Sequence, residues 1–184
     1  MSSLSNSVKV YEVSPTDLPR IEADLVKITA DCVEAGASIG FLKKEGPEPI
    51  IMWWEHLIAQ LDGQICRLFV AESAGKIAGC VLLARASKSN SRHRAEVQKL
   101  QVSPSCRRQG IAAKLLEHME QAARVAGIQL LILDTESSSG AVPLYEACDY
   151  QMLGDIPNYA ERPDGARHPT RIFYKELCPK TERI

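Results

Sequence analysis

One segment of the chain runs Val97-Gln98-Lys99-Leu100-Gln101-Val102-Ser103-Pro104-Ser105-Cys106-Arg107-Arg108-Gln109-Gly110-Ile111-Ala112, a pattern that predicts a strand, a turn and the beginning of a helix. Pro104 has no N–H and ends the pairing of the strand. Gly110 stands where the chain turns into the helix, whose first N–H groups have no intrahelical partner and lie at the positive end of its dipole. Because two arginines add cationic donors, we expect residues 107–112 to bind a pyrophosphate.

The residues after this turn predict a helix followed by a second strand. Gly127 stands where a helix C′ residue belongs, and the run Leu130-Leu131-Ile132-Leu133 has strand length. Strand, helix and strand therefore form one crossover unit with parallel strands. The apolar residues of the helix recur at intervals of three and four and are Ile111, Leu115, Leu116, Met119, Ala122, Ala123 and Ala126.

The rest of the chain alternates between strand and helix patterns. We expect Asp17 to cap a first helix that ends near Ala35, and residues 36–46 to form a flexible connection. The fold class is therefore α/β (α+β): a mixed, mostly antiparallel sheet flanked by helices, with a central strand-helix-strand crossover. The other expected elements are a strand at 8–13, a helix from about 50 to 61, strands at 67–72 and 76–86 joined by a hairpin at 73–75, and a last strand at 170–177.

Composition limits the classes of partner. The chain has 184 residues, a length that suits one domain, expected over 8–178 between a flexible N-terminus at 1–7 and a tail at 179–184. With 22 basic and 23 acidic residues the formal net charge is −1, which favours neither a nucleic acid nor a membrane surface as a partner. Six scattered cysteines without a matching histidine cluster argue against a metal site. Without a signal-peptide core or a bilayer-length apolar run, we expect reduced thiols and a cytoplasmic location.

Two motifs carry a family resemblance. Arg107-x-x-Gly110-x-Ala112, which follows an apolar strand and opens a helix, resembles the acetyl-CoA signature of the GNAT superfamily of N-acetyltransferases. About thirty residues later, Ala141-x-x-Leu144-Tyr145-x-x-x-x-Tyr150 resembles the second signature of the superfamily. Asp149 replaces a glycine that usually precedes the aromatic residue, and aspartate tolerates the left-handed backbone better than most residues.

A closer likeness covers most of the chain and resembles the tabtoxin-resistance type of GNAT enzyme. It is carried by Gly36-Ala37-Ser38-Ile39-Gly40-Phe41, Arg94-Ala95-Glu96-Val97-Gln98-Lys99-Leu100, Leu133-Asp134-Thr135-Glu136, Pro163-Asp164-Gly165 and Phe173-Tyr174-Lys175. The resemblance implies acetyl-CoA as co-substrate and no metal. Ser138 stands where the family often has an asparagine that contacts the pantetheine arm. The cofactor-binding residues implied are Leu100, Gln101, Val102, Arg107, Arg108, Gln109, Gly110, Ile111, Ala112 and Ser138.

Acetyl transfer to an amine needs a group that removes a proton and a group that protonates the departing thiolate. A free amine is mostly protonated at neutral pH, so a carboxylate assists, directly or through water. Glu96 and Asp134 are the candidates, and the matching residues of the tabtoxin-resistance group are its proposed catalytic acids. By resemblance, Tyr145 donates its phenolic proton to the leaving sulfur.

Structural interpretations of the same three residues remain open. Glu96 is alternatively an edge carboxylate that pairs with Arg94 or Lys99. Asp134 is alternatively a residue that orders the loop around 135–139, and Tyr145 a core aromatic. By resemblance, the acceptor pocket is lined by the 36–42 loop, the Trp53-Trp54 helix and the 159–168 loop, although a Trp-Trp pair on a helix is more often one core and one surface residue.

The leading hypothesis is an acetyl-CoA-dependent N-acetyltransferase that acetylates a primary amine of a small molecule by direct attack in a ternary complex. The resemblance points to a toxin, an antibiotic or an amino-acid-like metabolite, hence to a resistance role. Protein or peptide N-acetylation is the second hypothesis, and a non-catalytic acyl-CoA sensor is the third. Both a monomer and a homodimer are compatible with the sequence.

Overall fold

The computed structural model describes residues 8–61 and 63–177 of the chain. The terminal segments expected at 1–7 and 179–184, and Cys178, lie outside these residues. The elements are β1 (Lys9–Glu12), α1 (Leu18–Glu34), α2 (Glu48–Ile58), β2 (Cys66–Ser73), β3 (Lys76–Arg85), β4 (Arg94–Val102), α3 (Ile111–Val125), β5 (Leu130–Glu136), α4 (Val142–Ala147), β6 (Gln151–Glu161) and β7 (Arg167–Glu176), with short 3₁₀ turns at Lys43–Glu45, Ser89–Ser91 and Pro104–Cys106.

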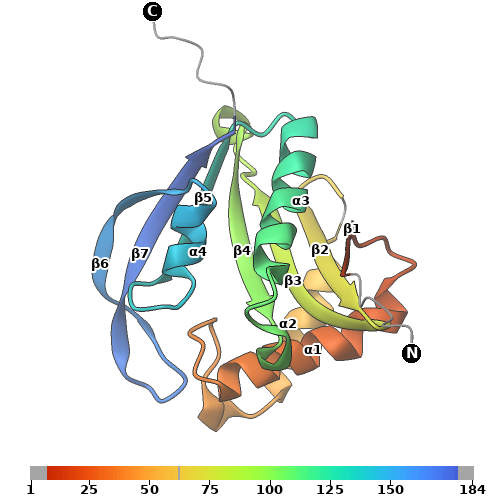
Figure 1. Ribbon diagram of the computed structural model, residues 1–184, viewed down its shortest axis with the longest axis vertical. Helices are drawn as coiled ribbons and strands as arrows, with labels where there is room; N and C mark the ends of the chain where they lie inside the picture. Colours follow the sequence, from red (N-terminus) through yellow and green to blue (C-terminus); the bar gives the residue numbers. More distant parts are fainter. Residues whose placement is uncertain (1–7, 62, 178–184) are drawn as a thin grey trace, which may run out of the picture.

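Within the described residues, seven strands form one sheet in the order β1-β2-β3-β4-β5-β7-β6. All neighbouring strands are antiparallel except β4 and β5, which are parallel and are connected through α3. The predicted fold class is therefore confirmed: a mixed, mostly antiparallel sheet with one strand-helix-strand crossover. Figure 1 shows α3 lying over β3 and β4, and α4 lying beside β5 and β7.

Each face of the sheet has its own apolar core. On one face α3 contributes Leu115, Leu116 and Met119, which pack with buried residues of β3, β4 and β5 and with Tyr145 of α4. On the other face α1 and α2 contribute residues such as Leu25 and Trp54, which pack on β2 and β3. The two cores hold the central strands rigidly from both sides.

The two parallel strands pair over only three positions. Arg94, Ala95 and Glu96 lie opposite Leu130, Leu131 and Ile132, and the pairing then stops although both strands continue. Figure 1 shows β4 and β5 close together at one end of the sheet and apart at the other. The opening between them, bordered by β4 residues 97–102 and β5 residues 133–136, is called the β4–β5 opening below.

A bulge in β4 accompanies this parting. Leu82 of β3 pairs with Gln98 and Cys80 pairs with Gln101, so two residues of β4, Lys99 and Leu100, oppose the single residue between them in β3. Lys99 has φ +50°, in the left-handed region that residues other than glycine rarely adopt. An extra residue of this kind bends its strand and increases the local twist. We attribute the divergence of β4 from β5 to this bulge.

Four local expectations differ from the structure. The helix after the turn begins at Ile111, so Arg107–Gly110 precede it. The second helix ends at Ile58 and not near residue 61. The Asp17 carboxylate makes no cap and instead accepts from the Ser14 N–H and hydroxyl, at 2.8 and 2.6 Å. Finally, residues 159–168 are not one loop, because β6 runs to Glu161 and β7 begins at Arg167.

Candidate active site

The turn before α3 presents backbone donors to open space. Gly110 is the N-cap of α3 and has φ 74° and ψ 6°, a conformation that favours glycine. No side chain caps this helix end, so the first N–H groups of the helix, beginning with those of Ile111 and Ala112, are left for a ligand. A Cβ at Gly110 would meet no atom within 4 Å. This geometry fits the phosphate groups of a nucleotide cofactor.

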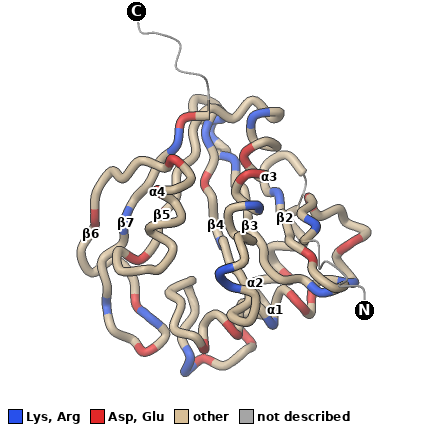
Figure 2. The backbone as a smooth tube through the Cα atoms, in the orientation of Figure 1, with Lys and Arg blue, Asp and Glu red and all other residues tan. Residues whose placement is uncertain are grey.

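Basic side chains surround the same turn. Figure 2 shows Lys and Arg gathered where β4 leads into α3. Arg108, like Gln109, is exposed, and Arg108 has φ 61°. Arg107 lies back against α1 and the end of β4, with Nε 3.3 Å from the Val102 carbonyl oxygen and Nη2 3.6 Å from Cys32 Sγ. Burial raises the pKa of the Cys32 thiol, and the hydrogen bond from Arg107 opposes that shift.

The strand before the turn presents two faces. Leu100 and Val102 are half-buried and pack against the core on the α3 face. Gln101 is buried on the opposite side, where the Thr29 hydroxyl lies 3.0 Å from the side-chain oxygen Oε1 of Gln101. The side-chain nitrogen Nε2 of Gln101 has no hydrogen-bond partner within the part of the chain that the structure describes.

Glu96 lies at the closed end of the β4–β5 opening. Its strand neighbours are buried on the α3 face, so alternation along the strand directs Glu96 to the α1–α2 face. The side chain is exposed and forms no ion pair with any described residue, Arg94 and Lys99 included. It borders a cavity of 350 Å³ lined by Ala84, Arg85, Ala86, Ser87, Lys88, Ser91, Arg94, Ala95, Glu96 and Ile132.

Asp134 follows the point where β5 leaves β4, and Tyr145 lies in α4. Asp134 lies two residues beyond Ile132, the last paired residue of β5, and its carboxylate is 3.3 Å from the Thr170 hydroxyl. Tyr145 is buried in α4, with its ring centroid 5.7 Å from those of Tyr150 and Phe173. Burial raises the pKa of Tyr145 well above its ordinary value, and the charge of Asp134 adds to this shift. The phenol therefore stays protonated through the neutral range.

A lysine that the sequence interpretation considered only as a partner of Glu96 completes this group. The Lys99 side chain is directed to the α1–α2 face, with its Nζ 4.8 Å from the Trp53 ring centroid. Burial lowers the pKa of the Lys99 ammonium, while Cys80 and Asp134 oppose that shift. Asp134 thus acts electrostatically on Tyr145, which lies in the core of the α3 face, and on Lys99, which lies on the α1–α2 face. Glu96 lies further into the paired part of the strands.

Two segments meet over the α1–α2 side of the opening. The Ser38 hydroxyl donates to the Glu161 carbonyl oxygen at 3.2 Å, and the Lys43 N–H donates to the Pro163 carbonyl oxygen at 3.2 Å. These bonds join the loop between α1 and α2 to the hairpin between β6 and β7. Both belong to the segments expected at the acceptor pocket, and these bonds hold the two segments together on that side of the sheet.

An ion pair fixes the hairpin to the end of β5. Arg162 donates to both oxygens of Glu136, one at 2.9 Å, and to the Ser138 hydroxyl at 2.9 Å. Ser138 in turn donates to Glu136. Arg162 holds the pKa of Glu136 below its ordinary value. The Ser138 hydroxyl, expected at the pantetheine arm, is therefore already engaged by two side chains.

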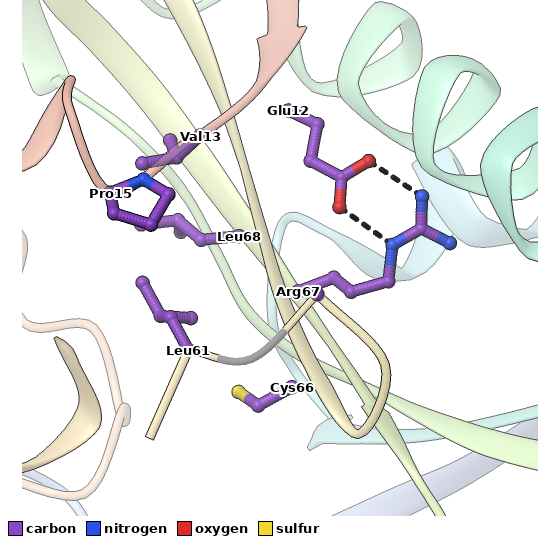
Figure 3. Close-up of a pocket in the computed structure, with 8 residues that line it drawn as sticks. Glu12, Val13, Pro15, Leu61, Cys66, Arg67 and Leu68 are labelled. Carbon is purple, nitrogen blue, oxygen red and sulfur yellow. Dashed lines mark hydrogen bonds and ion pairs between the residues drawn. The ribbon is translucent and has the colours of Figure 1, made fainter. Parts of the chain in front are cut away.

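A second pocket lies away from the opening, between β1, β2 and the segment that follows α2 (Figure 3). Its volume is 160 Å³, and Arg67 in its wall donates to both carboxylate oxygens of Glu12 at 2.7 and 2.6 Å. None of the expected site residues lines it. Among the described residues, His, Cys, Asp and Glu side chains form no cluster suited to a metal ion, and no helix has the length and apolar content to cross a membrane.

The parallel strands part after three pairs, beside a helix that begins at a left-handed glycine with open space before it, and this arrangement suits a cofactor that carries phosphate groups. The comparison with known families agrees. The chain belongs to the acetyltransferase (GNAT) family, whose sequence pattern matches residues 33–150. The predictions of an N-acetyltransferase and of acetyl-CoA as its co-substrate are thereby confirmed.

One curated relative is similar in sequence, and two solved structures share the fold. An N-acetyltransferase encoded in the hisH-hisA intergenic region of Azospirillum brasilense is 29% identical over 122 residues, which cover 65% of this chain and 71% of that protein. An N-acetyltransferase structure from Staphylococcus aureus Mu50 has a TM-score of 0.76 at 18% identity and covers 94% of this chain and 99% of its own. YncA of Salmonella typhimurium, solved with its cofactor acetyl-CoA, has a TM-score of 0.75 at 20% identity and covers 96% and 98%.

Proposed function

We propose that this enzyme transfers the acetyl group of acetyl-CoA to a primary amine of a small molecule, by direct attack in a ternary complex. One observation carries the proposal. The β4–β5 opening has a carboxylate, Asp134, which acts on the buried phenol of Tyr145, and the α1–α2 loop and the β6–β7 hairpin are hydrogen-bonded to each other on the α1–α2 side. A thioester between the strands would therefore lie between a proton donor and an acceptor compartment.

The cofactor residues divide by the part of acetyl-CoA that they would hold. The backbone N–H groups of Gln109, Gly110, Ile111 and Ala112 would bind the pyrophosphate, because no side chain caps them. Arg107 and Arg108 would neutralise its charge. The backbone of residues 100–102 would pair with the pantetheine arm, since this part of β4 has no partner in β5. Ser138 would contribute only after leaving Glu136 or Arg162.

Asp134 is the better placed of the two proposed bases. Acetyl-CoA supplies an activated thioester carbonyl, and the enzyme has to remove one proton from the amine and deliver one to the thiolate. Asp134 lies at the opening and acts electrostatically on Tyr145, whereas Glu96 lies where the strands are still paired. Asp134 would take the amine proton, directly or through water, and Tyr145, held protonated by burial, would donate its proton to the sulfur.

The enclosed acceptor side favours a small amine over a polypeptide. The two bonds from the α1–α2 loop to the β6–β7 hairpin, reinforced by the Arg162–Glu136 ion pair, hold these segments together where they would hinder an extended peptide. The likeness to the tabtoxin-resistance type also points to a free amine, and to a resistance role.

We propose a cytoplasmic location, which suits the free thiols of Cys32, Cys80, Cys106 and Cys148.

Release of CoA thiol from acetyl-CoA across a panel of small amines and peptides tests the proposal, with acetyl-CoA binding measured directly in parallel. We expect turnover with one class of small amine. Turnover with peptides but not with small amines would indicate that the acceptor is a protein. Tight binding without turnover on any acceptor would favour an acyl-CoA sensor, and absence of binding would refute the cofactor assignment.

A matched pair of variants separates the two carboxylates. Asp134→Asn and Glu96→Gln each remove one negative charge with almost no change in size. We expect Asp134→Asn to lower kcat by about 10²-fold or more, the usual contribution of a general base, and to flatten the pH profile. Glu96→Gln should keep the wild-type profile. The reverse ranking would transfer the role of base to Glu96.

A further inference from the structure

The amine of Lys99 lies in a site formed by a backbone carbonyl and two aromatic rings, and the acetyl transfer described above does not use it. Its Nζ donates to the Ile39 carbonyl oxygen and lies 5.1 Å from the Phe41 ring centroid and 4.8 Å from that of Trp53. A Cβ on Gly40 would come within 3.2 Å of the same nitrogen, so the absence of a side chain there leaves room for it. A carbonyl and two aromatic faces are groups that hold an ammonium or an amine.

The backbone also directs this lysine to the reaction centre. Lys99 has the positive φ of the β4 bulge, at the point where β4 has left β5. Its side chain lies on the same face as Asp134, whose charge acts on it across the opening. The lysine amine therefore belongs to the acceptor side of the sheet, between the carboxylate of β5 and the loop that follows α1.

The surroundings of Lys99 favour a reactive amine. Burial among apolar groups lowers its pKa, which enlarges the fraction of neutral, nucleophilic Nζ at a given pH. Two titratable groups face it, Cys80 from β3 and Asp134 from β5, and both oppose this shift. The Ile39 carbonyl can keep one N–H of the neutral amine, so its lone pair remains available to an acyl carbon.

We propose that Lys99 is a site of self-acetylation, at which Nζ takes the acetyl group of bound acetyl-CoA when the acceptor compartment is empty. This inference rests on the proposed function. The neutral Nζ bonds to the carbonyl carbon, the carbon–sulfur bond breaks, and the proton lost from nitrogen balances the proton gained by the CoA thiolate. The products are an uncharged acetamide on Lys99 and free CoA. The modified side chain no longer places an amine in the aromatic site.

The test is a mass measurement on the full chain with acetyl-CoA and no acceptor. We expect one acetyl group per chain, mapped to Lys99 by peptide analysis, with a matching burst of about one CoA thiol per enzyme. Lys76, an exposed lysine in the β2–β3 hairpin, is the internal control. Acetylation of Lys99 should exceed that of Lys76 by about tenfold or more, because a held amine and thioester react as an intramolecular pair.

Two variants and a control exclude chemical acetylation. Lys99→Arg keeps the charge and the aromatic contacts but lacks the nucleophile, and should abolish the burst, whereas Lys76→Arg should retain it. Tyr145→Phe should slow labelling of Lys99 but not of Lys76. In denatured protein the preference for Lys99 should disappear. The mapping on wild type keeps the test valid even where a variant folds poorly.

The outcomes separate this inference from the proposed function. Acetylation confined to Lys99 in the folded wild type supports it. Thiol release with an added amine, but no acetyl group on Lys99 in its absence, overturns the inference and leaves the transferase standing. Equal labelling of Lys99 and Lys76 also overturns it, as random chemistry. If no amine causes thiol release and Lys99 is not labelled either, both the inference and the proposed function are refuted.

Discussion

Replacement of Gly110 by alanine tests the cofactor assignment at the level of one methyl group. The left-handed backbone at φ 74° costs a non-glycine residue roughly 1–2 kcal/mol. No further steric cost arises, since the added Cβ meets nothing within 4 Å. For a chain of this length, that loss corresponds to a fall in Tm of about 2–8 °C. Gly110→Ala should therefore fold and remain measurable.

Gly127→Ala is the matched control at the other end of the same helix. Gly127 has φ 72°, and a Cβ there also meets nothing within 4 Å. Both variants should lose the same stability. Only Gly110→Ala should weaken acetyl-CoA binding, by about tenfold or more, because its methyl group stands in the space through which phosphate oxygens reach the first N–H groups of α3.

Thermal unfolding and isothermal titration with acetyl-CoA measure the two effects separately. Equal Tm decreases with a selective loss of affinity in Gly110→Ala would support a phosphate site at this turn. If Gly110→Ala bound acetyl-CoA as tightly as Gly127→Ala, the reasoning from the open space before the helix would be refuted. A loss of affinity in both variants would indicate a global effect of the strained helix on the protein.

Three further substitutions test the site and its supports. Tyr145→Phe keeps the buried ring and should lower kcat by about 10²-fold with acetyl-CoA affinity unchanged; wild-type turnover in steady-state assays would remove the proton-donor role. Arg162 depresses the pKa of Glu136. Their pairing therefore stabilises the fold fully at a pH above 4.5, the ordinary pKa of glutamate, and this stabilisation is lost as the pH falls through the lowered pKa. The Tm gap between wild type and Glu136→Gln should accordingly shrink in acid, and a constant gap would contradict this. In Gly79→Ala the new Cβ would lie 2.7 Å from the backbone oxygen of Gln101, so urea unfolding should show a loss of about 1–3 kcal/mol.

The crossover and the turn before α3 were predictable because their signals are local. The ends of these elements lie within one or two residues of Pro104, Gly110 and Gly127. The left-handed backbone expected at Asp149 is also present, with φ 61°. Each of these signals depends on the conformation of a single residue, which the sequence states directly.

The features that were missed depend on distant partners. β6 lacks alternation of apolar and polar residues because it is an edge strand that is mostly exposed on both faces, and it contains Gly154 and Pro157. The resemblance implied that a strand begins near Tyr150, but its extent to Glu161 follows from pairing with β7. The β4 bulge likewise follows from the register between β3 and β4, so nothing near Lys99 in the sequence announces its positive φ or its aromatic neighbours.

The energetics of Lys99 explain why its position calls for a functional interpretation. A left-handed backbone costs a lysine roughly 1–2 kcal/mol. Contacts of its ammonium with the Phe41 and Trp53 rings return about 0.5–2 kcal/mol, so the side chain contributes little net stability in a strained position that glycine would occupy without strain. Burial further disfavours its charged form. A lysine held there against its backbone preference, beside the β4–β5 opening, is better explained by its amine chemistry than by its packing.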